Sequence, residues 1–121
     1  MAEHNDLGKA GEELACEYLI NKGFKILERN WRFGNDEIDI IAQHADNLIV
    51  VEVKTRMTNF FGEPQTFVSK QKQGFLIRAA NVYSERIKQD LEVRFDIIGV
   101  VLSTGAAPII EHIEEAFLPR W

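Results

Sequence analysis

Two neighbouring apolar segments that carry acidic residues constrain this sequence most. Residues 35–56 read NDEIDIIAQHADNLIVVEVKTR, with runs of Ile, Leu and Val on either side of a short polar break. Glu37 and Asp39 interrupt the first run, and Glu52 interrupts the second, followed two positions later by Lys54. Such runs predict two strands joined by a tight turn. Because an unpaired carboxylate is costly in an apolar sheet, these acids need a cation nearby.

The turn between the two strands sets which side chains face each other. With residues 45–46 at its centre, Asp39 lies opposite Glu52. The same register brings Glu37 opposite Lys54, which makes Glu37 a lysine partner rather than a metal ligand. A shift of one residue would place the charges against valines, which the apolar pattern disfavours. The register therefore predicts one facing carboxylate pair, Asp39 and Glu52, with Lys54 beside it.

A facing pair of carboxylates predicts a cation. The two groups repel unless one is protonated or a positive charge lies between them. Carboxylate oxygens suit Mg²⁺ or Mn²⁺ rather than Zn²⁺, and the sequence contains no His/Cys cluster that would favour zinc. A lysine beside such an ion could orient a water molecule or stabilise charge developing on phosphorus. One interpretation of the pattern is therefore a metal site with room for a phosphate oxygen and a nucleophilic water.

Other interpretations fit the same residues. The acids and Lys54 would form a buried ion-pair network without a metal, although three acids against one lysine leave negative charge uncompensated. They would also suit an ordinary solvated sheet face. A third interpretation is an enzyme that uses Lys54 as a Schiff-base amine. That reaction needs a neutral amine, whereas a metal–carboxylate set would hold the lysine charged.

The charge is distributed unevenly along the chain. Its 121 residues carry a net charge of −5, which does not indicate a nucleic-acid-binding protein. Residues 54–94, however, contain eight basic and four acidic side chains, a local net charge of +4. A basic face can hold phosphates on an acidic protein, although the same side chains would also serve as solvated helix surface.

Length and composition predict a single globular domain over residues 1–121. No apolar run approaches the length of a membrane span, and the N-terminal residues lack the layout of a signal peptide. The single cysteine, Cys16, has no histidine near it in the sequence, which indicates a packing residue rather than a nucleophile. These features predict a cytoplasmic protein without a membrane partner.

Periodicity and capping residues predict the order α, β, β, β, α, β, β. The expected elements are a helix at 7–22 with Asp6 as N-cap, strands at 24–30, 36–43 and 48–55, a helix at 70–89 with Ser69 as N-cap, and strands at 93–102 and 109–114. Residues 56–68 are expected to form a loop, in which Phe60 and Phe61 would act as anchors or stack on a base. A helix between two apolar strands predicts a crossover, and hence an α/β fold with a mixed sheet.

The acidic motif and its surroundings resemble known nucleases. Asp39 with Glu52-Val53-Lys54 resembles the D…(D/E)xK motif of restriction-endonuclease-like enzymes. Nearly the whole chain resembles the small bacterial YraN-like family of predicted endonucleases, through the segments GKAGEELACEYLINKGFKILERNWR, EIDIIA, VVEVKTR, SKQKQGFLIRAA and RFDIIGV. It is also similar to archaeal Holliday-junction resolvases. The family usually reads Gly-Glu-Ile-Asp where this chain has Asp36 in place of the glycine, a departure that concerns the local backbone path more than the chemistry.

The resemblance implies a fold, a cofactor and a set of site residues. The fold is α/β/α and restriction-endonuclease-like, with a central mixed sheet of about five strands flanked by helices. The cofactor is Mg²⁺ or Mn²⁺. The implied ligands are Asp39, Glu52, the Val53 carbonyl and Glu12 of the first helix, with Lys54 as the catalytic lysine.

The predicted function is a metal-dependent endonuclease acting on DNA, with branched or junction DNA as the substrate if the likeness to resolvases extends that far. The expected phosphate contacts are Arg56, Lys70, Lys72 and Arg78, which would make binding fall with salt. A resolvase needs two cuts and hence a homodimer, for which residues 117–121 are a candidate contact. The alternative is a nucleic-acid- or protein-binding module on a nuclease fold without robust catalysis, which the net acidity favours.

Overall fold

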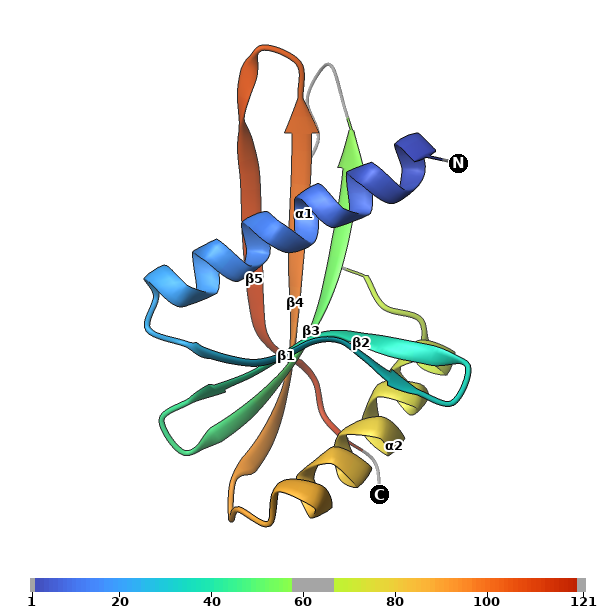
Figure 1. Cartoon of the computed structure of the whole chain (residues 1–121), viewed down its shortest axis with the longest axis vertical. Helices are drawn as coiled ribbons and strands as arrows, with labels where there is room; N and C mark the ends of the chain where they lie inside the picture. The colour runs from blue at the N-terminus through green and yellow to red at the C-terminus, as the bar shows by residue number, and fades with distance from the viewer. Residues whose placement is uncertain (1, 58–66, 120–121) are drawn as a thin grey trace.

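The chain folds into a five-stranded mixed sheet with two helices (Figure 1). The computed structural model describes residues 2–57 and 67–119. In chain order the elements are α1 (Ala2–Asn21), β1 (Lys25–Phe33), β2 (Asp36–His44), β3 (Asn47–Met57), α2 (Lys70–Ile87), β4 (Glu92–Ser103) and β5 (Ala106–Phe117). This order and the mixed sheet confirm the α/β fold predicted from the sequence.

Some element boundaries differ from the predicted ones. The first helix begins at Ala2, so Asp6 lies inside it and is not the N-cap. Strand β1 continues to Phe33, beyond its predicted end at residue 30, because residues 31–33 also pair with β2. The N-cap of α2 is Ser69 as predicted, and its Oγ accepts a hydrogen bond of 3.2 Å from the amide of Lys72. Phe60 and Phe61 lie outside the described residues.

The strands follow one another across the sheet in the order β1-β2-β3-β4-β5. The pair β3–β4 is parallel and joined through α2, and the other three pairs are antiparallel. In Figure 1, α1 crosses over β3, β4 and β5, whereas α2 lies at the lower end of the sheet. The turn at residues 45–46 gives the predicted register near it, with His44 paired to Asn47 and Ile40 to Val51.

Each helix covers a separate apolar core on the sheet. The core under α1 includes Ala15, Cys16, Leu19, Ile40, Val51 and Ile98. The core under α2 includes Ile38, Val50, Leu76, Ala79, Tyr83 and Phe95. Because side chains alternate along a strand, Glu52 and Lys54 share the α2 side of β3 with Val50, and Thr55 shares the α1 side with Val51. The acidic residue of β3 thus lies where α2 can reach it.

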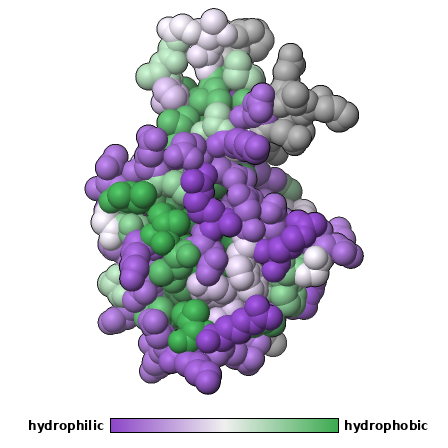
Figure 2. All heavy atoms as spheres, in the orientation of Figure 1, coloured by the Kyte–Doolittle hydropathy of each residue, from purple (hydrophilic) through white to green (hydrophobic). Residues whose placement is uncertain are grey.

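The face of the molecule that is turned to the viewer in Figure 1 has a largely polar surface. Figure 2 shows hydrophilic residues over most of it, with apolar residues reaching the surface in a broken band along the left side of the view. Within the described residues, no helix combines the length and apolar character needed to cross a membrane.

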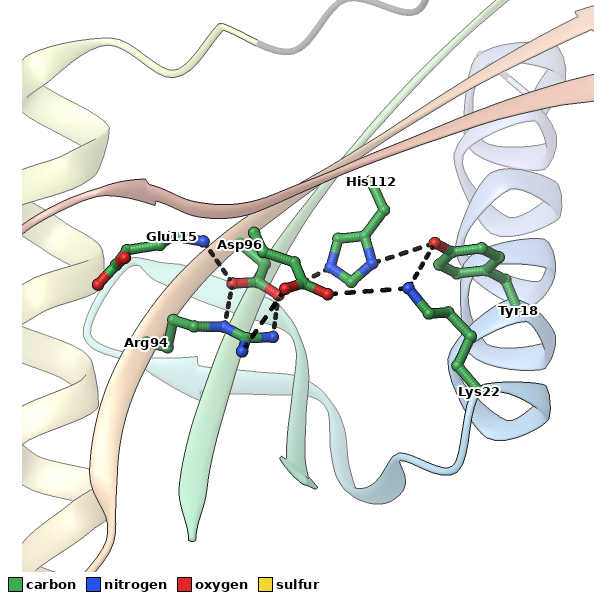
Figure 3. Close-up of polar contacts among 7 residues, drawn as sticks. Tyr18, Lys22, Arg94, Asp96, His112 and Glu115 are labelled. Carbon is green, nitrogen blue, oxygen red and sulfur yellow. Dashed lines mark hydrogen bonds and ion pairs between the residues drawn. The ribbon is translucent and has the colours of Figure 1, made fainter. Parts of the chain in front are cut away.

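A buried charged cluster ties β4 and β5 together and connects them to α1 (Figure 3). Asp96 of β4 is 1% exposed and receives two hydrogen bonds of 2.9 Å from Arg94. His112 Nε2 lies 2.7 Å from the same carboxylate, and His112 Nδ1 lies 3.2 Å from the hydroxyl of Tyr18 on α1. The Glu115 amide also donates to Asp96, at 3.1 Å. The cluster therefore fixes the C-terminal half of α1 against the sheet.

The N-terminal half of α1 is fixed by a glycine. Gly11 is buried against β3, and a Cβ placed on it would overlap the Oγ1 of Thr55. Any larger residue would push α1 away from the sheet. This close approach matters for the site, because Glu12 follows Gly11 and its position depends on the distance between α1 and β3.

Substitution of Gly11 by alanine is expected to destabilise the protein by ~1–3 kcal/mol, the usual effect of overpacking a well-filled contact. Gly8→Ala is the matched control in the same helix, since a Cβ at Gly8 meets no atom within 4 Å. Alanine is the better helix former by roughly 1 kcal/mol, so the control should gain stability. Urea unfolding of both variants measures the difference, and equal shifts would contradict the proposed contact.

Candidate metal centre

The acidic residues of β2 and β3 meet where these two strands separate. Their pairing ends at Ile40 and Val51. Beyond that pair β2 changes the face it presents, because Ile40 packs under α1 whereas Ile38 packs under α2. Residues two apart on a regular strand would share one face. Asp39 lies between them, at the change of face.

Strand β1 changes face at the same level. Asn30 has a left-handed backbone with φ 52°, a conformation that asparagine tolerates better than most residues. On one side of it, Arg29 contacts Glu13 of α1 at 3.1 Å. On the other side, the ring of Trp31 packs edge-on against Tyr83 of α2, with centroids 5.2 Å apart. The irregularity therefore spans both strands.

The Asp39 carboxylate takes the place of a backbone acceptor. Its Oδ2 accepts a hydrogen bond of 2.8 Å from the amide of Val53 on β3. Asp39 is thus not a ladder partner of Glu52, as the register alone predicted, because its side chain crosses to β3 where the β2 backbone has moved away. The result still brings the Asp39 carboxylate beside Glu52. The main chain of Val53, whose carbonyl was predicted as a ligand, is part of the same arrangement.

Asp39 and Glu52 form an acidic pair, in which Glu52 is buried and Asp39 is partly buried. Glu52 is only 8% exposed. Burial, followed by repulsion from Glu52, raises the pKa of Asp39 to about 8, against the lowering effect of the Val53 amide. Burial also raises the pKa of Glu52, although Lys72, Lys54 and a hydrogen bond with Asp39 oppose that change. Two carboxyl groups in this state favour a shared proton or a cation over two free charges.

One oxygen of this pair lacks a hydrogen-bond partner. Glu52 Oε1 is buried and has no hydrogen-bond partner. Lys72 Nζ lies 3.9 Å away, which is beyond hydrogen-bonding distance. Leaving a buried acceptor unsatisfied is costly, and a divalent cation would satisfy it. The donor chemistry therefore fits Mg²⁺ or Mn²⁺.

The side chains that could hold a cation here are two carboxylates. In the part of the chain that the structure describes, no three His, Cys, Asp or Glu side chains gather closely enough to hold a metal ion. Magnesium is commonly bound through one or two carboxylates, with water filling the remaining positions. Asp39 and Glu52 are sufficient for that mode of binding.

Glu12, implied as a further member of the site, points elsewhere. Its Oε1 accepts a hydrogen bond of 3.1 Å from Nδ2 of Asn30. Its charge nevertheless contributes to raising the pKa of Asp39. Glu12 therefore lies within electrostatic range of the pair without being gathered into it. The sequence signal for its position is the preceding Gly11, since apolar periodicity does not single out Glu12.

Lys54 lies beside the pair, but not with the partner that the register predicted. Its side chain is partly buried on the same side of β3 as Glu52, and its charge lowers the pKa of Glu52. Glu37 does not pair with Lys54, because β2 and β3 have separated at that level. In the β1–β2 ladder, Glu37 lies opposite Arg32 instead.

Lys72 of α2, predicted only as a phosphate contact, lies inside the site. Its Nζ is 2.9 Å from Oδ2 of Asp36 and 3.9 Å from Glu52. Burial disfavours the charge on Asp36, but hydrogen bonds from Lys72 and the Glu37 amide lower its pKa below the ordinary value. Asp36 stands where the resemblance leads one to expect glycine, and this ion pair gives it a structural partner. Nothing in the local sequence pattern joins Asp36 to Lys72.

The other predicted phosphate contacts are spread over this side of the molecule. Arg56 is two residues beyond Lys54 on β3, so strand alternation places both on the same side of the sheet. Lys70 and Arg78 are exposed on α2. Arg78 lines the same cavity as Lys72, whereas Lys70 lines a smaller one beside Leu118. The structure therefore brings Lys72 and Arg78 together and leaves Lys70 apart from them.

The chain is similar over almost its full length to proteins of one family. The model of the family described as "Uncharacterised protein family UPF0102" matches residues 11–100. A UPF0102 protein of Christiangramia forsetii is 52% identical over 117 residues, which cover 97% of this chain and 98% of the relative. A UPF0102 protein of Flavobacterium psychrophilum is 53% identical with the same coverage. One from Phocaeicola vulgatus is 49% identical over 119 residues, or 98% of each chain.

Proposed function

We propose that this chain, which belongs to the uncharacterised protein family UPF0102, is a metal-dependent endonuclease that hydrolyses phosphodiester bonds of DNA. The observation that carries the proposal is the pairing of the partly buried Asp39 with the buried Glu52, whose Oε1 has no hydrogen-bond partner, with Lys54 next to them. The restriction-endonuclease-like character of the chain is part of the proposal, and it rests on the same motif together with the mixed sheet.

Each residue of the site has a role in this mechanism. Asp39 and Glu52 would hold the cation, and Glu12 would join them on leaving Asn30. With Mg²⁺ or Mn²⁺ held there, the site would have a Lewis acid for the phosphate and a water of lowered pKa. Lys54 would orient the attacking water or stabilise negative charge as it develops on the phosphate. Lys72 would hold the substrate phosphate after exchanging Asp36 for it.

The basic residues support DNA as the substrate. Arg56, Lys70, Lys72 and Arg78 lie on β3 and α2, which border the acidic pair. Contacts from such residues to phosphates release counterions, so binding should weaken steeply as salt increases. Cleavage of branched DNA would need two such sites, and therefore a homodimer.

Lys54→Ala is expected to lower DNA cleavage by ~10²–10³-fold, the usual effect of removing one group that stabilises developing charge. The measurement is a cleavage panel of linear, flapped and four-way DNA, and matching RNA, in Mg²⁺ and in Mn²⁺. Lys25→Ala is the control, because this exposed lysine begins β1 at the end remote from the β1–β2 turn. If Lys54→Ala cuts as well as the native protein, the activity does not come from this site.

A binding module without robust catalysis is the second candidate. It is favoured by the direction of Glu12, which bonds to Asn30 and leaves the pair with two carboxylates. Calorimetric titration with Mg²⁺ and Mn²⁺, followed by the cleavage panel, separates the two functions. Metal and DNA binding without cleavage of any substrate would establish the binding module, and absence of metal binding would exclude the nuclease mechanism.

A further inference from the structure

A cavity of about 580 Å³ is lined in part by Lys72, the residue that also lies 3.9 Å from Glu52. It lies between the β1–β2 turn and the first half of α2, which are neighbours in Figure 1. Its volume is in the range of small-ligand sites. The residues that matter for its chemistry are Phe33, Asn35, Asp36, Lys72, Phe75 and Arg78. None of the roles proposed above requires a cavity here.

The cavity offers aromatic rings. Phe33 and Phe75 line it, with ring centroids 6.1 Å apart and planes inclined at 47°. Both side chains are only partly buried. Phe33 is in turn stacked on Trp31, at 6.1 Å with planes 10° apart, which holds its ring in place. Exposed, supported rings of this kind are stacking platforms for nucleobases.

The charged residues of the cavity favour an anion. Lys72 and Arg78 against Asp36 give its lining a net charge of +1. The amide groups of Asn35 and Gln71 also line it, and each offers both a donor and an acceptor. The lining thus combines what a nucleotide presents: a flat ring, a hydrogen-bonding edge and a phosphate.

Lys72 connects the cavity to the acidic pair. Its Nζ lies 5.1 Å from the ring centroid of Phe75, a residue that lines the cavity. The same Nζ lies 3.9 Å from Glu52 Oε1. A phosphate bound to Lys72 would therefore lie beside Asp39 and Glu52. A base attached to that nucleotide would be within reach of the two phenylalanine rings.

We propose that this cavity binds one unpaired nucleotide of the DNA substrate, with the base against Phe33 and Phe75 and the phosphate at Lys72 and Arg78. The proposal rests on the proposed function and names its substrate class. A base inside a duplex cannot enter such a cavity without leaving the stack, which is costly. The protein therefore selects DNA with unpaired nucleotides next to the cleaved bond over continuous duplex.

The test measures binding without metal, so that it does not depend on cleavage. Fluorescence anisotropy in EDTA compares a duplex carrying a short single-stranded overhang with a blunt duplex of equal length. The native protein should bind the overhang more tightly. Phe75→Leu keeps an apolar side chain but removes the ring, and should reduce that preference by about 5- to 10-fold. Arg78→Ala, which changes an exposed residue, should also weaken overhang binding more than blunt binding.

Phe117→Leu is the matched control, because Phe117 is a partly buried phenylalanine packed on the same core but outside the cavity. It should keep the native preference. Equal affinity of the native protein for both DNAs, or equal losses in Phe75→Leu and Phe117→Leu, would overturn the proposal. The same DNAs in Mg²⁺ separate it from the proposed function. Cleavage without the preference refutes the nucleotide site alone, whereas the preference without cleavage refutes the nuclease alone.

Discussion

Asp39→Asn is expected to stabilise the metal-free protein at pH 8 and to remove its response to Mg²⁺. Folding raises the pKa of Asp39 from 3.8 to about 8, so the folded state binds this proton more tightly than the unfolded state. The contribution to stability is complete below pH 4 and is lost as the pH rises to about 8. Asparagine has no such charge to bury and can still accept the hydrogen bond from Val53.

Thermal unfolding in EDTA between pH 5 and 8.5 measures this effect. The native protein should lose roughly 2–5 kcal/mol relative to Asp39→Asn across that range. Mg²⁺ should raise the unfolding temperature of the native protein at pH 8 by binding to the folded state, and should not raise that of the variant.

Asp36→Asn is the control for this titration. The pKa of Asp36 is lowered, so its contribution is lost only as the pH falls below its ordinary value. The variant should therefore keep the native slope between pH 5 and 8. A flat native profile in EDTA, or a destabilised Asp39→Asn, would show that Asp39 is ionised without a cation and that the acidic pair is not under strain.

Asp96→Ala is expected to lower the free energy of unfolding by about 3–5 kcal/mol, because it leaves the partners of a buried carboxylate without their acceptor. Arg94, His112 and the Glu115 amide all bond to Asp96 (Figure 3). Burial opposes its ionisation, but these bonds prevail and lower the pKa of Asp96. Its contribution is therefore present above pH 4 and is lost as the pH falls through the lowered pKa. Urea unfolding at pH 7 and at pH 3 measures both effects.

Glu114→Ala is the matched control within the same cluster. Glu114 is half exposed and contacts Lys22 at 3.7 Å and Arg94 at 3.9 Å. Exposed ion pairs contribute ~0–1 kcal/mol, so this variant should be near native. Comparable losses in the two variants would mean that the burial of Asp96 does not determine the strength of the cluster.

The element order was predictable because local sequence patterns determine it. Alternating apolar runs gave the strands, and Ser69 marked the start of α2. The 45–46 turn determined the register next to it, as the pair His44–Asn47 shows. The start of α1 was missed because Asp6 is a residue type that favours the N-cap position, although the helix begins at Ala2. Local capping signals therefore identify helices more reliably than they locate their ends.

The geometry of the site was predictable only as far as regular pairing holds. Alternation placed Glu52 and Lys54 on one side of β3, but it could not reveal that β2 leaves the ladder after Ile40. The change of face coincides with a left-handed backbone at Asn30, on a third strand, which local periodicity also does not reveal. The Asp36–Lys72 pair was missed because it joins a hairpin to a helix 36 residues away. Contacts of that kind are set by packing, which periodicity does not report.

The single crossover through α2 also has a consequence for the order of folding. Strands β1, β2 and β3 are joined by short turns, as are β4 and β5, so each group can assemble through local contacts. The parallel β3–β4 pair closes a longer loop, and non-local contacts form more slowly. We therefore expect Asp39 and Glu52 to approach each other before α2 delivers Lys72. The acids thus meet first without their internal cation, and a proton is the partner that is available at once.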